Sequence, residues 1–281
     1  MKKSSLLSGL IASSLLMSTS LFANIDDEIV NFEKKRLSKN PNVKILDVEV
    51  HSKKPLLQTN WTGYILNVKG EVQGKGIEVK DILFSDGKIV ATELYDLKTA
   101  KALKSLVTPD ITPEYYKEEK LIAGNHNGKN KIVVFSDPLC PYCMDLIPSI
   151  IEFVKENSED IGLYYYHYPL VQSHPAALVL SKLIDVANEK NIENIEYKVY
   201  KADWEEYFKD EETNPVVILN AFNEEFKTDI KLAEIMDKKV DMAIATDMKM
   251  ADNLMITGTP TVYVNGKKDL KREFFETLGK K

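Results

Sequence analysis

The chain contains two cysteines, Cys140 and Cys143, which are separated only by Pro141 and Tyr142. A disulfide between cysteines this close would close almost no loop, so it would add little stability through the unfolded state. Redox chemistry, in which a dithiol opens and closes, explains the spacing better. We predict that Cys140 is the nucleophile that attacks a disulfide and that Cys143 resolves the mixed disulfide. Pro141 and Tyr142 would support this site.

The residues around the cysteines predict a strand, a turn and a helix. The run Lys131–Ser136 is typical of a buried strand, and the apolar spacing of Met144–Val154 is helical. Cys140 would then stand at the start of the helix, where unpaired N–H groups and the helix dipole favour a thiolate. Pro141 suits the first helical turn because its missing N–H would have no partner there. Pro148, one turn further on, is expected to kink the helix.

Three other uses of the two cysteines explain the spacing less well. Half of a zinc site would need further ligands, and the four histidines are scattered along the chain. An inert bridge would close a very short loop. A Cys–His hydrolase could pair Cys140 with His167 or His174, but it leaves Cys143 without a role. We expect no metal and no cofactor.

Residues 1–23 have the pattern of a cleavable secretory signal. Lys2 and Lys3 precede an apolar stretch, Leu6–Met17, and Leu21–Ala23 offers a cleavage site. The apolar stretch is short and rich in serine for a membrane span. We therefore expect an exported protein, in a compartment where disulfides form and persist. A retained membrane anchor is the alternative.

Charge and length narrow the class of protein. The chain has 281 residues and a formal net charge of −6 at pH 7, and removing the leader with its two lysines makes this charge more negative. A negative charge argues against nucleic acid as a partner. The length suggests one large domain or two moderate ones.

The pattern of elements divides the chain after the leader into three parts. Residues 24–98 predict a short helix followed by strands, a small α+β unit that is either a folded appendage or a dimerisation platform. Residues 99–128 predict a helical linker that two prolines interrupt. Residues 129–281 contain the cysteine motif, a parallel β–α–β arrangement and an almost wholly helical insertion at about 174–250.

A second motif lies near the C-terminus, at Thr259 and Pro260. Pro260 directly precedes the predicted strand Thr261–Val264, where a proline removes no interior hydrogen bond of the sheet. The dipeptide Asn265–Gly266 favours a hairpin turn after this strand.

The two motifs together resemble the thioredoxin-fold periplasmic thiol–disulfide oxidoreductases. The resemblance rests on Phe135–Cys143 and Gly258–Gly266, which occur in this order on either side of a helical insertion. It covers about residues 129–281 and implies an α/β thioredoxin-like fold. It also implies that Pro260 follows a cis peptide bond and faces the dithiol. The backbone of Thr259 would pair with a substrate strand, and its hydroxyl would tune the nucleophile's thiolate.

The finer resemblance is to the dimeric DsbC/DsbG branch, which includes DsbK-like proteins. It rests on the Pro-Tyr dipeptide of the cysteine motif and on Phe84–Lys88 leading to Leu94–Leu97, which resembles the hairpin of that branch's N-terminal domain. It implies a cystatin-like dimerisation domain, a helical linker and a homodimer. The chain departs from the branch in lacking the second, structural disulfide of DsbC-type catalytic domains.

The resemblance implies a periplasmic disulfide isomerase or reductase. Its substrates would be unfolded or misoxidised exported proteins, and a membrane reductase or oxidase would be its redox partner. Two alternatives stay open: a DsbA-like dithiol oxidase in a dimeric scaffold, and a dimeric periplasmic chaperone with secondary redox activity. The direction of transfer depends on the reduction potential of the dithiol relative to its partners.

Overall fold

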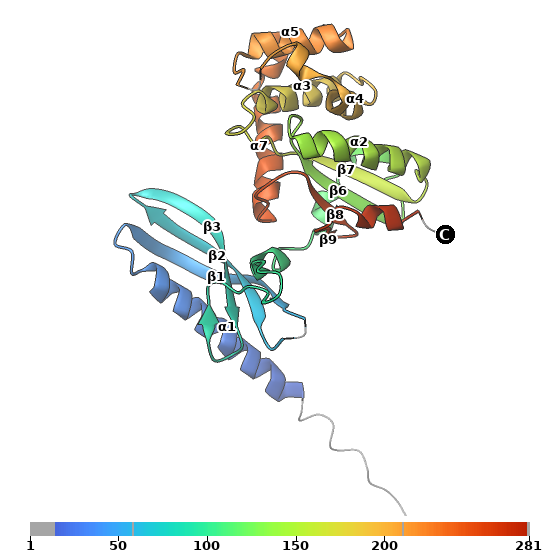
Figure 1. The fold of residues 1–281 in the computed structure, drawn as a ribbon. Coiled ribbons are helices and arrows are strands. Elements are labelled where there is room, and N and C mark those ends of the chain that lie inside the picture. Colours follow the sequence, from blue (N-terminus) through green and yellow to red (C-terminus); the bar gives the residue numbers. More distant parts are fainter. Residues whose placement is uncertain (1–14, 58, 210, 280–281) are drawn as a thin grey trace, which may run out of the picture. The chain divides into compact units, whose positions relative to one another are not determined.

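The computed structural model of the chain describes residues 15–57, 59–209 and 211–279, which form two compact units, Met1–Pro109 and Asp110–Lys281 (Figure 1). The predicted leader, residues 1–23, lies largely outside the described residues. No helix within the described parts of the chain is long and apolar enough to cross a membrane.

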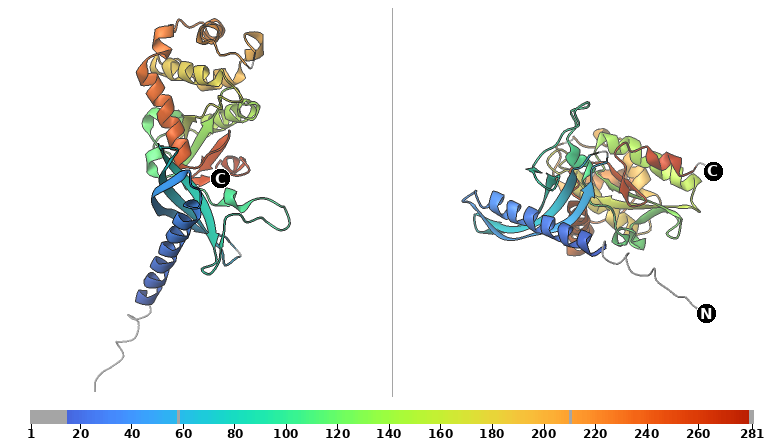
Figure 2. Two further views of the ribbon diagram at one scale, coloured as in Figure 1. Left: turned by 90° about the vertical axis from the view of Figure 1, so that its left-hand side faces the viewer. Right: turned by 90° about the horizontal axis from the view of Figure 1, so that it is seen from below.

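The N-terminal unit is a long helix followed by an antiparallel sheet. The elements follow one another in space as they do in the sequence: α1 (Leu15–Leu37), β1 (Val43–Pro55), β2 (Thr62–Val72), β3 (Lys75–Ser85) and the short β4 (Val90–Ala91). Figure 2 shows α1 lying along one face of this sheet. Alternate strand residues point to that face and form an apolar core with the helix, made of Ile29, Val48, Tyr64, Leu66, Val68 and Leu83.

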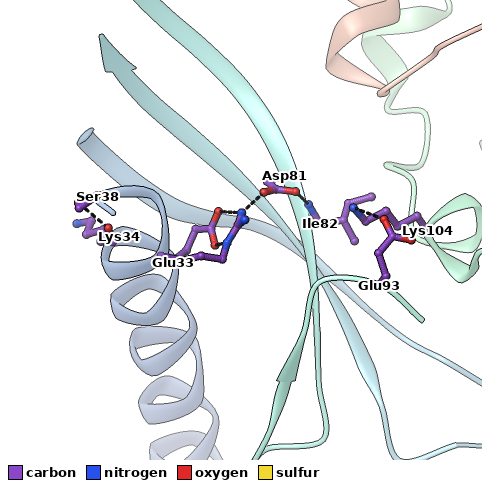
Figure 3. A network of polar contacts seen from close by, with 8 residues as sticks. Glu33, Lys34, Ser38, Asp81, Ile82, Glu93 and Lys104 are labelled. Carbon is purple, nitrogen blue, oxygen red and sulfur yellow. Dashed lines mark hydrogen bonds and ion pairs between the residues drawn. The ribbon is translucent and has the colours of Figure 1, made fainter. Parts of the chain in front are cut away.

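A partly buried ion cluster also joins α1 to the sheet (Figure 3). The carboxylate of Glu33 is fully buried and accepts two hydrogen bonds from Arg36, at 2.7 and 2.6 Å. The same guanidinium contacts Asp81 on β3 at 2.5 Å. A buried carboxylate is costly unless it is paired, so Arg36 makes the burial of Glu33 possible.

The C-terminal unit is a five-stranded mixed sheet covered on both faces. Its strand order is β5 (Leu121–Gly124), β7 (Ile161–His167), β6 (Asn130–Ser136), β8 (Thr261–Val264) and β9 (Lys267–Lys268). The central strands β6 and β7 are parallel and are connected through α2 (Pro141–Glu156), whereas the other pairs are antiparallel. A parallel pair requires such a crossover.

The two faces of this sheet have separate cores because side chains alternate along each strand. On one face, Ile132, Val134, Leu163 and Tyr165 pack with the apolar side of α2. On the other face, Val133, Phe135, Tyr164 and Tyr166 pack with Ala251 and Leu254 from the end of the helical insertion.

The insertion between β7 and β8 consists of α-helices, in the stretch where one was expected at about 174–250. These are α3 (Ala177–Glu189), α4 (Ile195–Lys201), α5 (Pro215–Phe226), α6 (Leu232–Ile235) and α7 (Lys238–Asn253). The insertion has a third core, in which Trp204 stacks with Phe208 and Phe222.

The structure differs from the helical linker expected at residues 99–128. It has only short 3-10 turns, at Leu103–Leu106, Pro113–Tyr115 and Glu118–Lys120, and then strand β5 of the C-terminal sheet. Prolines remove a backbone donor and restrict the preceding residue, so no long helix forms there. The boundary between the two units falls inside this stretch, after Pro109.

Candidate active site

The two cysteines lie at the start of α2. Cys140 is the N-cap residue, Pro141 occupies the first helical position, and Cys143 lies in the first turn. The backbone N–H groups of Cys143 and Met144 donate to the carbonyl oxygen of Cys140, at 2.8 and 3.0 Å. Both cysteines are free thiols in this structure. Pro148 lies within the helix, which continues past it to Glu156.

The two sulfurs differ in their access to a substrate. Cys140 is 6% exposed and Cys143 is fully buried, whereas Tyr142 between them is 72% exposed. A substrate disulfide can therefore approach Cys140 past Tyr142 but cannot reach Cys143 directly. This arrangement suits an attacking thiol and an internal resolving thiol.

The loop before β8 lies directly against the dithiol. The peptide bond between Thr259 and Pro260 is cis, and the Cys140 thiol donates a hydrogen bond to the carbonyl oxygen of Thr259 at 3.6 Å. The hydroxyl of Thr259 is buried and has no close hydrogen-bond partner among the described residues. The structure thus brings together Cys140, Thr259 and Pro260, which are far apart in the sequence.

Electrostatics separates the two thiols further. The hydrogen bond from the Cys143 thiol lowers the pKa of Cys140 most, and burial opposes it. The side chain of Thr259 and the backbone N–H groups of Tyr142 and Cys143 lower it further, so that the pKa of Cys140 is about 5. Burial, together with the neighbouring Cys140, raises the pKa of Cys143 well above its ordinary value. At neutral pH the pair is therefore a thiolate beside a thiol.

Asp137, three residues before Cys140, holds the loop that precedes the helix. Its fully buried carboxylate accepts hydrogen bonds from the backbone N–H groups of Leu139 and Leu170, both at 2.7 Å. The Nδ1 atom of His174 lies 3.0 Å from the same carboxylate. His174 therefore helps to fix the loop rather than to activate the nucleophile.

The Cys–His arrangement of a hydrolase is not formed. His167 is 3% exposed, and its ring meets the ring of Tyr165 edge-on. Within the described residues, neither His167 nor His174 is hydrogen bonded to Cys140. The described part of the chain also has no group of three or more His, Cys, Asp or Glu side chains placed to hold a metal ion.

Two hollows border the dithiol. One, of about 260 Å³, is formed by the loop Thr257–Val262 and by the segment Lys268–Arg272. The other, of about 180 Å³, lies between the start of α2 and the insertion, and its walls include Pro141, Met144, Trp204 and Phe208.

The structure adds three buried hydroxyl residues to the site: Ser136, Tyr165 and Tyr200. Ser136 ends β6, and its hydroxyl is one of the groups that act on Cys143. The hydroxyl of Tyr200 donates to Ser136 Oγ at 2.7 Å and lies 2.9 Å from that of Tyr165. The sequence analysis did not identify them. Tyr200 comes from the helical insertion, and no local pattern links it to the cysteines.

Comparison with known proteins gives the following matches. A family model described as Thioredoxin matches residues 116–280. The chain is 26% identical over 172 residues to the probable disulfide bond formation protein D of Bacillus anthracis, which covers 56% of this chain and 74% of that protein. It is 26% identical over 153 residues to the Na(+)/H(+) antiporter NhaA 1 of Salinispora arenicola, which covers 52% of this chain and 22% of that protein. The chain thus spans about a fifth of the antiporter's length.

Among solved structures, oxidised BdbD from Bacillus subtilis matches with a TM-score of 0.46 and 14% identity, over 61% of this chain and 93% of that one. The family model covers more than half of the chain, including the cysteine motif and the loop around Pro260. It confirms the expected α/β thioredoxin-like fold of the C-terminal unit. The chain belongs to the thioredoxin family.

Proposed function

We propose that this protein is a thiol–disulfide oxidoreductase that acts on exported proteins through Cys140 and Cys143. The observation that carries the proposal is the contrast between the two sulfurs. Cys140 has a pKa of about 5 and lies near the surface at the start of α2, whereas Cys143 is enclosed behind it. A thiolate at neutral pH beside a thiol is the reactive state of a disulfide-exchange centre.

The chemistry is an exchange of sulfur–sulfur bonds. The Cys140 thiolate attacks a substrate disulfide, one substrate sulfur leaves as a thiolate, and a mixed disulfide forms. Cys143 or another substrate thiol then attacks this mixed disulfide. In the opposite direction, a substrate thiolate attacks the oxidised Cys140–Cys143 pair, and Cys143 leaves as a thiolate.

The loop around Pro260 is the proposed binding site for the polypeptide. The half-buried Thr259 borders the 260 Å³ hollow, and an extended segment can pair with backbone groups at such a position. Tyr142, at 72% exposure, offers an aromatic surface beside the sulfur. Main-chain pairing would let the enzyme act on many sequences, as a general disulfide catalyst must.

The direction of transfer has two candidates. The resemblance to the DsbC/DsbG branch favours an isomerase or reductase. The low pKa of Cys140 favours the second candidate, a disulfide donor, because a stabilised thiolate makes the reduced form more stable and the disulfide more oxidising. Alkylation of the thiols in intact cells measures the resting state. A mostly oxidised pair supports the donor, and a mostly reduced pair supports the isomerase.

A trapping experiment tests the chemistry itself. In a Cys143→Ala variant the mixed disulfide through Cys140 has no internal resolving thiol, so it should accumulate on exported proteins and disappear on reduction. The matched control is Cys140→Ala, which retains the buried Cys143 and should trap nothing. Equal trapping by both variants, or by neither, would contradict the proposed nucleophile.

We also propose that the N-terminal unit is a dimerisation domain. Strand β1 pairs only with β2 in the described sheet, and the outer edge of a long strand is available for pairing with another chain. Leu46 on β1 and Val79 on β3 are 56% and 48% exposed. Light scattering of the full-length protein should give twice the mass of one chain. A single-chain mass at micromolar concentration would remove the dimer from the proposal.

Export to the periplasm, with residues 1–23 as a cleaved signal, completes the proposal. The pattern of Lys2, Lys3 and the following apolar stretch supports it, and so does a dithiol suited to an oxidising compartment. Fractionation of expressing cells and N-terminal sequencing of the recovered protein test it. An uncleaved chain in the cytoplasm would contradict this part. The proposal also includes a redox partner in the membrane, a reductase for an isomerase or an oxidase for a disulfide donor.

A further inference from the structure

Cys143 has to change its protonation state in every cycle, although it is fully buried. It is a thiol before it attacks a mixed disulfide, and in the opposite direction it leaves the disulfide as a thiolate. Burial raises its pKa, so the thiol holds its proton strongly. Bulk water does not reach this sulfur directly, so the protein must provide a route for the proton.

A line of buried hydroxyl groups leads away from Cys143. Ser136 interacts with the Cys143 side chain. The Tyr200 hydroxyl on α4 donates to Ser136 Oγ at 2.7 Å, and the hydroxyl of Tyr165 on β7 lies 2.9 Å from that of Tyr200. Tyr165 is 2% exposed, Tyr200 is 1% exposed and Ser136 is fully buried. Three hydroxyls in a line inside an apolar core are costly unless each is hydrogen bonded.

The donor and acceptor roles in this line match the deprotonated state of the Cys143 sulfur. Because Tyr200 donates to Ser136, the proton of Ser136 is free to point to the Cys143 sulfur, which is the arrangement that stabilises a thiolate. Reversing each donor gives the arrangement for the thiol. A hydroxyl has one donor and two acceptor positions, so each group can serve in both.

The far end of the line opens on a cavity of about 550 Å³, which Tyr165 helps to line. Its wall includes titratable groups from β7, α3, α4, α7 and the segment before β5, namely Lys120, His167, Asp185, Glu196, Lys239 and Asp247. A cavity of this size with charged side chains in its wall is one that water can enter. A proton that reaches Tyr165 can therefore leave the core.

Glu196 is a buried carboxyl group in this wall. It is 4% exposed, and its Oε1 accepts a hydrogen bond from Asn188 at 2.6 Å. Burial raises the pKa of this carboxyl, so it binds a proton more readily than an exposed glutamate. Its charge also acts on the Tyr165 hydroxyl.

We propose that Ser136, Tyr200 and Tyr165 form a proton relay that connects Cys143 with Glu196 and the cavity. The relay rests on the proposed thiol–disulfide exchange and adds to it the route of the proton. It serves both directions of exchange, so it does not depend on whether the protein is an isomerase or a donor.

The resolving step balances as follows. The sulfur of Cys143 attacks the sulfur of Cys140, a bond forms between them, and the bond from Cys140 to the substrate breaks. The substrate leaves as a thiolate with the electron pair of the broken bond. The proton of Cys143 passes to Ser136, whose own proton passes to Tyr200, and so on through Tyr165 to the carboxylate of Glu196. When the Cys140–Cys143 bond is opened, the same steps in reverse protonate Cys143.

The two steps can be separated with dithionitrobenzoate, used at one equivalent per reduced chain. Attack by Cys140 releases one thionitrobenzoate, and resolution by Cys143 releases the second. Because the chain has no other cysteine, both signals come from this site. The first phase depends on reagent concentration and the second does not.

The relay predicts that Tyr165→Phe, Tyr200→Phe and Glu196→Gln slow the second phase by about a hundredfold or more, the scale of assisted proton transfer. The first phase should stay unchanged. Glutamine keeps an acceptor for Asn188 but is not a base. The matched control is Tyr166→Phe. Tyr166 lies on the same strand as Tyr165, but its buried hydroxyl donates to the backbone carbonyl of Tyr115 and is not part of the relay. This control should resolve at the wild-type rate.

Three results would overturn the relay. The first is a second phase at the wild-type rate in all of the relay variants. The second is a second phase slowed equally in the control Tyr166→Phe. The third is a second phase of the unmodified protein that has the same rate in D₂O and in H₂O. The last measurement needs no variant, so misfolding of a variant does not affect it. Loss of the first phase in the unmodified protein would instead contradict the proposed function.

Discussion

The ion cluster of the N-terminal unit and the dithiol site of the C-terminal unit treat their buried polar groups in opposite ways. In the N-terminal unit the buried carboxylate of Glu33 is paired at 2.6 Å with Arg36, which also contacts Asp81. In the C-terminal unit the hydroxyl of Thr259 and the Nδ1 atom of His167 are buried and find no partner in the part of the chain that the structure describes. The two thiols there have pKa values shifted in opposite directions.

This difference separates structural from chemical uses of a buried polar group. A fully paired charge holds two elements together and has no reason to change its protonation state. A group with an unused hydrogen bond or a shifted pKa can respond when a neighbour gains or loses a charge. The comparison predicts that substitutions in the first unit change stability and that those around the dithiol change reactivity.

The largest expected effect is on stability, from Arg36→Ala. This change leaves the Glu33 carboxylate buried without its partner, so the free energy of unfolding of the N-terminal unit should fall by about 3 kcal/mol. Chemical denaturation followed by circular dichroism measures it. Both phases of the thionitrobenzoate reaction should stay at the wild-type rate under native conditions.

Lys44→Ala is the matched control for this prediction. Lys44 forms an ion pair with Glu71 at 3.3 Å in which its side chain is 69% exposed, and exposed pairs contribute little. If Arg36→Ala and Lys44→Ala lower the free energy of unfolding equally, burial does not make the Arg36–Glu33 pair more stabilising than the exposed Lys44–Glu71 pair. If Arg36→Ala slows the attack by Cys140, the division between structural and chemical groups fails.

The second prediction concerns the pH dependence of Cys140. With a pKa of about 5, the attack rate should be constant from pH 8 to pH 6 and fall below pH 5, by about tenfold for each pH unit. The first phase of thionitrobenzoate release measures it. A midpoint near the ordinary cysteine value of about 8.5 would contradict the assigned environment.

The same pKa has a consequence for stability. The folded-state pKa of Cys140 lies below the unfolded value of about 8.5, so its thiolate stabilises the reduced folded chain. This stabilisation is complete above the unfolded value and is lost as the pH falls through about 5. The oxidised chain has no such thiolate, so its stability should not show this loss between pH 8 and pH 5.

The sequence predicts the parts of the site that depend on neighbouring residues. The spacing of Cys140 and Cys143 and the proline between them determine the chemistry and the start of the helix, and both follow from local rules. The pairing of this motif with Thr259 and Pro260 required the resemblance to a family, because no local rule relates two loops that are 119 residues apart.

The relay residues show why the remainder could not be predicted. Tyr164, Tyr165 and Tyr166 are consecutive on one strand, and tyrosines on strands usually contribute packing. Only the fold brings Tyr200, 35 residues further on, against the hydroxyl of Tyr165. The helical linker expected at residues 99–128 was wrong for a related reason. Part of this stretch forms strand β5, which pairs with the distant strand β7.

The smallest expected effect is that of Thr259→Val, which replaces the buried hydroxyl by a methyl group of similar size. The hydroxyl stabilises the thiolate, but less than the hydrogen bond from Cys143 does. The midpoint of the attack rate should therefore rise by about one pH unit or less. The second phase should be unaffected at neutral pH.

Thr257→Val tests whether this effect belongs to the hydroxyl or to the loop. Thr257 lies two residues earlier and is exposed, so its substitution should leave the midpoint in place. An equal rise in both variants would assign the effect to the backbone of the loop, whose carbonyl at Thr259 already contacts the sulfur. If the pH midpoint of the attack rate is unchanged in Thr259→Val, the buried hydroxyl does not respond to the neighbouring thiolate. The contrast between paired structural groups and responsive groups at the dithiol would then not hold for Thr259.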